Sequence, residues 1–271
     1  MPNWCTNRLI VIDERSPGNG RELEKFINAI TIDGDTSGGW PSTVGDHEHD
    51  LTLPYPTPEI LLGTRSPKQT VEQIEEMRAK RDAGEMKAHE NYVGETQDGS
   101  WCTDEYLQEM LDQIKQGDEA HAETGFHSWY DWNIAHWSTK WSPDVHEILV
   151  DVGGDLSTAT VSYQTAWGPS EALIAQLSKL HPALTFVESY IEEGMCFWGA
   201  NVYIEGEQRH SHYGHEDEVM DSLQEKYGKV LDDDTDADEE DRMMIAITER
   251  WQGLMDRAET DALSIAAVLN A

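Results

Sequence analysis

Three histidines lie close together in the stretch His210-Ser211-His212-Tyr213-Gly214-His215, which a short acidic run follows. Imidazole and carboxylate groups are common ligands of transition metals, and this spacing lets the three rings share one ion. Structural zinc sites usually draw ligands from two separated elements, and no paired cysteines accompany these histidines. The sequence therefore offers a divalent-metal site at His210, His212 and His215, with a solvated polar loop as the alternative. No other cofactor is predicted.

An aromatic segment over residues 129–141 is the most unusual feature of the chain. Tryptophan offers a large contact area at a small loss of side-chain freedom, so such a segment can form a pocket or the contact point for a partner. The alternative is that these rings fill the core, because the chain has only four phenylalanines. The candidate binding residues are Trp129, Trp132, His136, Trp137, Lys140, Trp141 and Trp167.

Carboxylates dominate the charged residues. The chain has 19 lysines and arginines against 53 aspartates and glutamates, which gives a net charge of −34. Binding to nucleic acid or to an anionic membrane normally needs clustered lysine and arginine, so both are excluded as direct partners. The same charge attracts a protein with a basic surface. Adaptation to high salt and simple solubility are the alternatives.

The densest acidic run is Leu231–Asp241, with eight acidic residues in eleven positions. Such a run is typical of a solvated linker. It is also the candidate acidic interaction surface, which consists of Asp232, Asp233, Asp234, Asp236, Asp238, Glu239, Glu240 and Asp241.

Motifs of familiar enzyme classes are missing from the sequence, which has no phosphate-binding glycine loop, nucleophile elbow or zinc-protease helix. The sequence therefore favours a protein that is not an enzyme. Three widely spaced cysteines argue against a disulfide framework. No basic region followed by an apolar stretch marks a signal peptide, and no apolar run approaches about 20 residues. We expect a protein of the host cytoplasm without a membrane span.

The hydrophobic periodicity predicts an α+β fold. Alternating apolar residues predict strands at 4–12, 184–191 and 196–204 and a hairpin at 145–163, whereas helical spacing predicts helices at 20–31 and from 168. This order is the βαββαβ arrangement of a ferredoxin-like antiparallel sheet.

Two further helical patterns, at 68–90 and 103–117, interrupt that arrangement. Thr103 is expected to cap the second of them. We therefore predict a ferredoxin-like domain over 1–206, with a large helical insertion at 32–143 after the first helix. An acidic helical extension over 207–271 would comprise a linker and one or two C-terminal helices.

Four segments carry a family resemblance, namely Pro2–Leu9, Thr57–Thr64, Trp137–Trp141 and Thr165–Pro169. Over residues 1–205 the chain resembles the YubB-type ferredoxin-like family of bacteriophages and conjugative plasmids. The resemblance implies a ferredoxin-like fold, a mobile-element origin and no established activity, and it supplies no catalytic residues. The chain departs from the family at Ser138, where the family has Gly, and at Gly168, where it has Ser or Pro.

The sequence and the resemblance together predict a phage or plasmid accessory protein that binds and modulates a host protein with a basic surface. In its narrowest form this protein is a DNA mimic that acts as a counter-defence factor. One alternative is a small-molecule or metal-dependent enzyme that uses a pocket lined by histidine and tryptophan. Another is a structural or virion-associated protein. The oligomeric state does not follow from the sequence.

Overall fold

The computed structural model describes residues 3–14, 20–32, 49–85, 89–90, 96–97, 101–153, 156–192, 194, 197–215 and 237–270. Side chains are described for these residues except 89–90, 96–97, 237–248, 250 and 251. The chain divides into two compact units. Unit 1 comprises 1–56 and 135–271, and unit 2 comprises 57–134. No helix among the described residues is long and apolar enough to cross a membrane.

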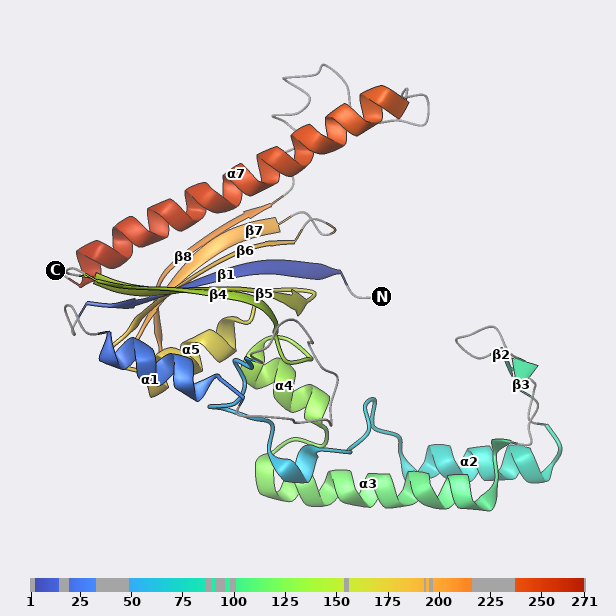
Figure 1. Cartoon of the computed structure of the whole chain (residues 1–271). Helices are drawn as coiled ribbons and strands as arrows, with labels where there is room; N and C mark the ends of the chain where they lie inside the picture. The colour runs from blue at the N-terminus through green and yellow to red at the C-terminus, as the bar shows by residue number, and fades with distance from the viewer. Residues whose placement is uncertain are drawn as a thin grey trace. The chain divides into compact units, whose positions relative to one another are not determined.

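Unit 1 is built on a six-stranded antiparallel sheet with the order β4-β5-β1-β6-β7-β8 (Figure 1). This confirms the predicted α+β class and antiparallel sheet. The strands are β1 (Trp4–Asp13), β4 (Asp144–Gly153), β5 (Leu156–Ala166), β6 (Thr185–Glu192), β7 (Phe197–Ile204) and β8 (Glu207–His215).

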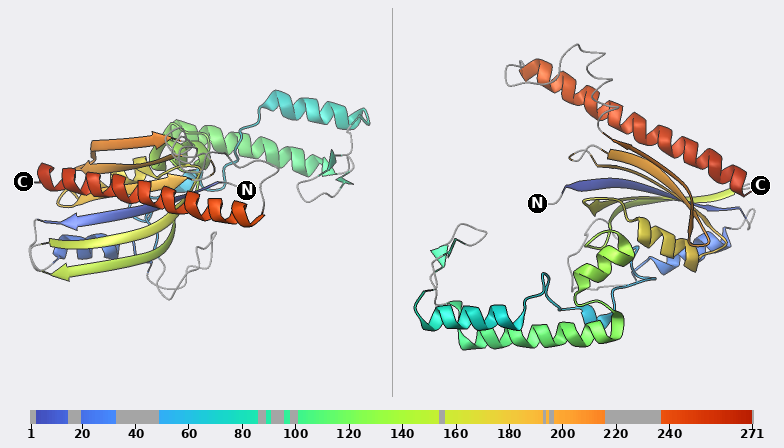
Figure 2. Two further views of the ribbon diagram at one scale, coloured as in Figure 1. Left: turned by 90° about the horizontal axis from the view of Figure 1, so that it is seen from above. Right: turned by 180° about the vertical axis from the view of Figure 1, so that it is seen from behind.

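One face of the sheet is covered by α1 (Arg21–Ala29) and α5 (Glu171–Leu180), and we call it the α5 face (Figures 1 and 2). The apolar side of each helix is turned inward, with Leu23 and Phe26 on α1 and Leu177 on α5 fully buried. Phe26 meets Phe186 of β6 edge-on, with ring centroids 5.4 Å apart. The helical spacing of these residues therefore fixes which side of each helix faces the sheet.

The opposite face is covered over β6, β7 and β8 by α7 (Ala237–Leu269), and we call it the α7 face (Figure 2). Three small residues at four-residue spacing, Ala258, Ala262 and Ala266, let the helix approach the strands closely. The buried residues of this layer are Ile12, Val187, Ile191, Trp198, Ala200, Val202, Leu254, Met255, Ala258, Ala262 and Ala266.

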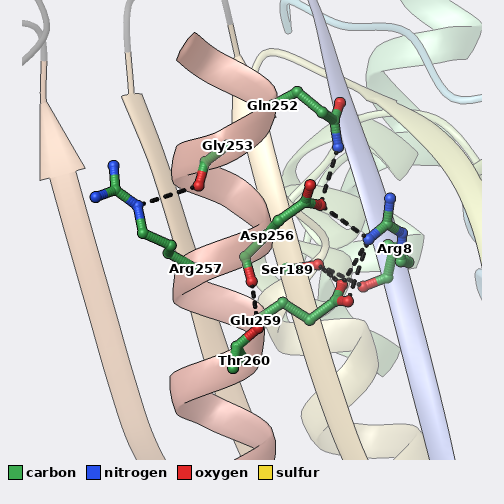
Figure 3. Close-up of polar contacts among 8 residues, drawn as sticks. All are labelled: Arg8, Ser189, Gln252, Gly253, Asp256, Arg257, Glu259 and Thr260. Atoms are coloured by element: carbon green, nitrogen blue, oxygen red, sulfur yellow. Dashed lines mark hydrogen bonds and ion pairs between the residues drawn. The ribbon is translucent and has the colours of Figure 1, made fainter. Parts of the chain in front are cut away.

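A polar clamp joins α7 to the sheet beside this apolar layer (Figure 3). The Nη1 atom of Arg8 on β1 lies 3.1 Å from Oε1 of Glu259 and 3.3 Å from Oδ1 of Asp256. The Ser189 hydroxyl on β6 donates to Oε2 of Glu259 at 2.6 Å. Helix and sheet are thus linked by a partly buried ion pair across 251 positions of the sequence.

Strand β8 begins directly after the predicted domain boundary at 206. Residues 207–215 pair with β7 along its length, whereas the sequence indicated the start of a solvated linker. The strand lies at the sheet edge and only Gly214 in it is buried, so it lacks the apolar alternation by which strands are recognised. Unit 1 also includes α7, so the C-terminal residues belong with the sheet.

Unit 2 contains a helical pair, α2 (Val71–Asp82) and α3 (Asp104–Thr124), with a short 3-10 turn η1 (Glu59–Leu61) and the two-residue strands β2 (His89–Glu90) and β3 (Thr96–Gln97). Thr103 caps α3 as predicted, because its hydroxyl accepts the N–H of Tyr106 at 3.2 Å. Four buried residues hold the helices together, namely Ile74, Cys102, Leu107 and Met110.

The second compact unit comprises 57–134 and lies within the predicted insertion at 32–143. Residues 49–56 belong to unit 1, because Asp50 N–H donates to the Ile30 carbonyl at 2.8 Å and Trp137 Nε1–H donates to the Tyr55 carbonyl at 3.0 Å. The prolines between 54 and 58 suggested an irregular connection. They gave no sign that the connection returns to the first helix.

The predicted acidic surface lies mostly outside the described part of the chain. Asp232, Asp233, Asp234 and Asp236 are not among the described residues. Asp238, Glu239, Glu240 and Asp241 lie in the first turns of α7, but their side chains are not among those described. The interaction surface proposed for this run therefore remains a prediction.

Candidate functional site

The aromatic segment 129–141 divides between core and surface. Helix α4 (Trp129–Trp137) contributes two buried rings, Trp132 and Trp137. Trp129 is half-buried, and its N–H donates to the Thr64 hydroxyl at 3.0 Å. The His136 ring is also half-buried and lies 6.0 Å from the Tyr55 ring. Two of these four candidate side chains are therefore buried and two are half-buried.

Among the described side chains of unit 1, three exposed tryptophans gather at one end of the sheet. Trp4 begins β1 and is 46% exposed, Trp141 is 41% exposed, and Trp167, directly after β5, is 47% exposed. The Trp4 and Trp141 ring centroids are 6.3 Å apart with their planes tilted by 33°. We call Trp4, Lys140, Trp141 and Trp167 the tryptophan patch.

Backbone contacts hold the patch together. Trp4 is the cross-strand partner of Ala166, and Trp167 N–H donates to the Asn3 carbonyl at 2.9 Å. The Thr139 hydroxyl donates to the Ala166 carbonyl at 3.4 Å, which ties the segment before Trp141 to the end of β5. Three chain segments that are far apart in the sequence therefore carry their tryptophans on backbone that is hydrogen-bonded together at this end of the sheet.

The patch already holds one cation. The Lys140 ammonium lies 3.7 Å from the centroid of a Trp141 ring, well within the roughly 6 Å at which a ring face attracts a positive charge. The contact shows that the face of the Trp141 ring accepts an ammonium group. A lysine or arginine of a partner fits the same type of site.

Two residues have left-handed backbone conformations that favour glycine, Trp167 in the patch with φ 75° and Ser138 beside it with φ 60°. Strain of this kind concentrates at functional sites. The Ser138 hydroxyl accepts the N–H of Ala172 at 3.2 Å in the first turn of α5. That hydrogen bond offsets part of the conformational cost of a non-glycine residue there.

Sequence reasoning missed Trp4 as a site residue. It occupies the first position of a strand with inward-facing Cys5, Asn7 and Leu9, so the pattern assigned it to a strand without separating its exposed side. The signal that identifies it is alternation, because Trp4 is out of phase with those buried residues.

The three histidines do not converge on one point. His210 and His212 pair with Val202 and Ala200, which lie on the α7 face, whereas His215 pairs with Phe197 of the other face. Adjacent positions of a strand project to opposite sides, so the odd spacing between His212 and His215 separates them. Among the described residues, no group of three or more histidine, cysteine, aspartate or glutamate side chains is placed to hold a metal ion.

Sequence reasoning also missed a buried polar cluster under α5. Glu188 on β6 is fully buried, and its Oε1 accepts the Tyr163 hydroxyl at 2.7 Å and the Ser170 hydroxyl at 3.3 Å. Its Oε2 has no hydrogen-bond partner among the described residues, and neither has Oδ1 of Asn201, its cross-strand neighbour on β7. Burial raises the pKa of Glu188 from 4.5 to about 7.

The cluster also encloses Cys5, whose pKa burial raises well above 9.0, so the thiol is not activated as a nucleophile. Because Glu188 and Cys5 have no exposed surface, a substrate cannot reach them in this conformation. The cluster belongs to the interior of the fold.

Comparison with known proteins supports the ferredoxin-like assignment for part of the chain. Residues 146–245 match a family model described as a ferredoxin-like domain in Api92-like protein. That range includes most of β4, all of β5 to β8, and the beginning of α7. No curated protein matches the chain.

Among solved structures, the chain is similar to the crystal structure of protein api92 from Yersinia pseudotuberculosis. The sequences are 11% identical, and the alignment covers 80% of this chain and 99% of that one. The TM-score is 0.33.

Proposed function

We propose that this chain is a binding protein that captures a partner with a basic surface through the tryptophan patch. The observation that carries the proposal is the cluster of exposed indole rings at one end of the sheet, one of them already under a lysine ammonium. Exposed tryptophans held on a fixed backbone are typical of the residues that dominate binding energy at protein interfaces.

The net charge of −34 supports the same partner chemistry. A strongly negative protein attracts a basic partner over distance and so raises the rate of encounter, while the aromatic rings supply short-range affinity. Lysine and arginine side chains satisfy both requirements, because each is attracted by the overall field and by a tryptophan face.

The broader role that we propose is that of a phage or plasmid accessory protein that modulates a host protein. This rests on the resemblance to the YubB-type family. The proposal includes the finer fold assignment that β1, α1, β4, β5, α5 and β6 form the βαββαβ unit, with α2 and α3 in an insertion.

The DNA-mimic form is less well supported than general binding to a basic partner. Helix α3 carries seven carboxylates over 21 residues, or about 32 Å at about 1.5 Å per residue. That is one charge per about 4.5 Å, whereas duplex DNA carries one per about 1.7 Å. Mimicry of a duplex by α3 alone would therefore need more charge than the helix has.

The proposal is tested by titrating the protein with tetralysine and with tetraglutamate while following the tryptophan indole N–H signals by NMR. Tetralysine should shift the Trp4, Trp141 and Trp167 signals, and tetraglutamate should shift none of them. Trp141→Ala should weaken tetralysine binding about fivefold or more, because it removes a ring face with its cation–π attraction.

Tyr213→Ala is the matched control, because Tyr213 is an aromatic residue of β8 that is 59% exposed and lies outside the patch. It should leave the affinity unchanged. Added salt should weaken binding, since the attraction is largely electrostatic. Affinity that is equal in the Trp141 and Tyr213 variants, or insensitive to salt, would contradict the proposal.

A further inference from the structure

Strand β4 forms one edge of the sheet, and its apolar side chains are largely exposed. Only β5 pairs with it among the described strands. Leu149, Val150 and Val152 are 58%, 50% and 53% exposed. Natural proteins commonly protect an edge with lysine, proline or a bulge, because its free N–H and C=O groups invite another strand. β4 contains no lysine or proline, and its register shift lies between Val145 and Glu147, which leaves 147–153 regular.

The two sides of β4 differ in chemistry. Ile148, Val150 and Val152 lie on the α5 face, because their cross-strand partners include the buried Val161 and Ala159. Glu147 and Asp151 lie on the opposite face with Leu149 between them. A strand added to this edge would therefore meet apolar side chains on one face and two carboxylates on the other.

These carboxylates argue against a second copy of the chain as the added strand. An antiparallel pairing of two β4 strands about Leu149 would place Glu147 of one copy opposite Asp151 of the other. Like charges directly opposite destabilise a pair of strands, and two chains of −34 repel each other as a whole. Charge complementarity instead selects a partner strand with lysine or arginine at these positions.

The edge is continuous with the tryptophan patch. Trp141 precedes Asp144, the first residue of β4, by three positions, and Asp144 and Trp4 pair with Gln164 and Ala166 on β5. A segment that runs antiparallel to β4 would therefore leave the edge at the end where the patch lies.

We propose that β4 docks an extended segment of the partner protein by strand addition, with basic residues opposite Glu147 and Asp151 and apolar residues opposite Ile148, Val150 and Val152. This deepens the proposed function and rests on it for the basic character of the partner. It adds the conformation that the partner adopts and the second surface that it contacts.

The test uses two synthetic peptides with blocked ends and equal charge, Val-Lys-Val-Thr-Val-Lys-Val and Val-Lys-Val-Pro-Val-Lys-Val. Proline lacks the N–H that a ladder needs and fixes its own backbone angle, so the second peptide pairs poorly as a strand. The first peptide should bind at least tenfold more tightly. Hydrogen exchange of β4 amides in 147–153 should slow on binding, while exchange in β8 should not change.

The variant Glu147→Lys with Asp151→Lys should weaken binding of the first peptide about tenfold. The control is Glu109→Lys with Asp112→Lys on α3. It changes the net charge by the same amount, and both residues are exposed and lie in unit 2, away from β4 in the sequence. It should weaken binding much less. Equal weakening by both double variants would overturn the proposal, because it would indicate a general effect of charge.

The outcomes also separate this proposal from the function on which it rests. If the two peptides bind equally, leave β4 exchange unchanged and lose affinity with Trp141→Ala, the patch binds cations but strand addition is wrong. If neither peptide binds while tetralysine binds the patch, strand addition is again wrong. If tetralysine does not bind but β4 is protected by the first peptide, the edge docks strands and the patch proposal fails.

Discussion

Glu188 and Glu259 are enclosed on opposite faces of the same sheet and are accommodated in different ways. Glu188 lies under α5 with hydroxyl donors to one oxygen and, in the described part of the chain, no donor to the other. Glu259 lies on α7, where Arg8 contacts both of its oxygens and Ser189 donates to one. Ser189 directly follows Glu188 in β6. The strand therefore carries Glu188 on one face of the sheet and, on the other face, the hydroxyl that donates to Glu259.

The difference shows what a buried carboxyl group requires. A charge removed from water must either meet an opposite charge or be neutralised by a proton. Glu259 has the guanidinium of Arg8, whereas Glu188 has only neutral donors and a pKa that burial raises to about 7. A proton on Glu188 Oε2 would supply a donor for the oxygen of its cross-strand partner Asn201, which has no donor among the described residues.

The largest effect is expected for Glu188→Gln, which imitates the protonated side chain. The folded state holds the Glu188 proton more tightly than the unfolded state. Its contribution to stability is therefore complete below about pH 4.5 and is lost as pH rises to about 7. A rise of the pKa from 4.5 to about 7 corresponds to about 3 kcal/mol. The variant should gain about that much over the wild type at pH 8 and almost nothing at pH 4.

Chemical unfolding of both proteins across this pH range measures the difference. Glu259→Gln is the matched control, and it should be destabilising at pH 8 because it removes a charge that Arg8 requires. A Glu188→Gln effect that is independent of pH would show that Glu188 is not the titrating group.

A smaller effect is expected for the clamp between Arg8 and Glu259. The ion pair is partly exposed, with 32% and 13% of the two side chains accessible, so solvent screens part of its energy. A double-mutant cycle with Arg8→Met and Glu259→Gln should give a coupling free energy of about 1 kcal/mol. Added salt should reduce the coupling. A coupling near zero would mean that the apolar layer between α7 and the sheet holds the helix in place without help from the ion pair.

A direct cost of similar size is expected for Tyr163→Phe, which deletes the 2.7 Å hydrogen bond to Glu188. Loss of one hydrogen bond should lower the free energy of unfolding by about 1 kcal/mol. That bond also lowers the pKa of Glu188 against the larger effect of burial, so the variant should raise this pKa further. The free energy of unfolding should then continue to fall up to a higher pH in the variant than in the wild type. An unchanged range would show that Tyr163 does not influence the ionisation.

The sequence predicted the strands and helices whose apolar residues repeat regularly. β1, the β4–β5 hairpin, α5 and the Thr103 cap follow from local pattern and capping chemistry, and the α+β class follows from their order. β8 could not be recognised, because an edge strand buries almost nothing and its composition is that of a loop.

The candidate sites were harder to predict than the fold, because they depend on which side of an element faces solvent. The aromatic segment was recognised, but its division into buried Trp132 and Trp137 and exposed Trp141 depends on tertiary packing. Glu188 gave no signal in the sequence. Its burial among polar neighbours depends on Tyr163, Ser170 and Asn201, which come from three different parts of the sequence.

The position of α7 has a consequence for biosynthesis. This helix is translated after the strands that it covers, so Val187, Ile191 and Trp198 on β6 and β7 lack their cover while the ribosome is still completing the chain. An apolar sheet surface left open during synthesis is a binding site for chaperones and a starting point for aggregation. Slowing translation before codon 252 should therefore increase the share of nascent chains that are captured by chaperones or precipitate.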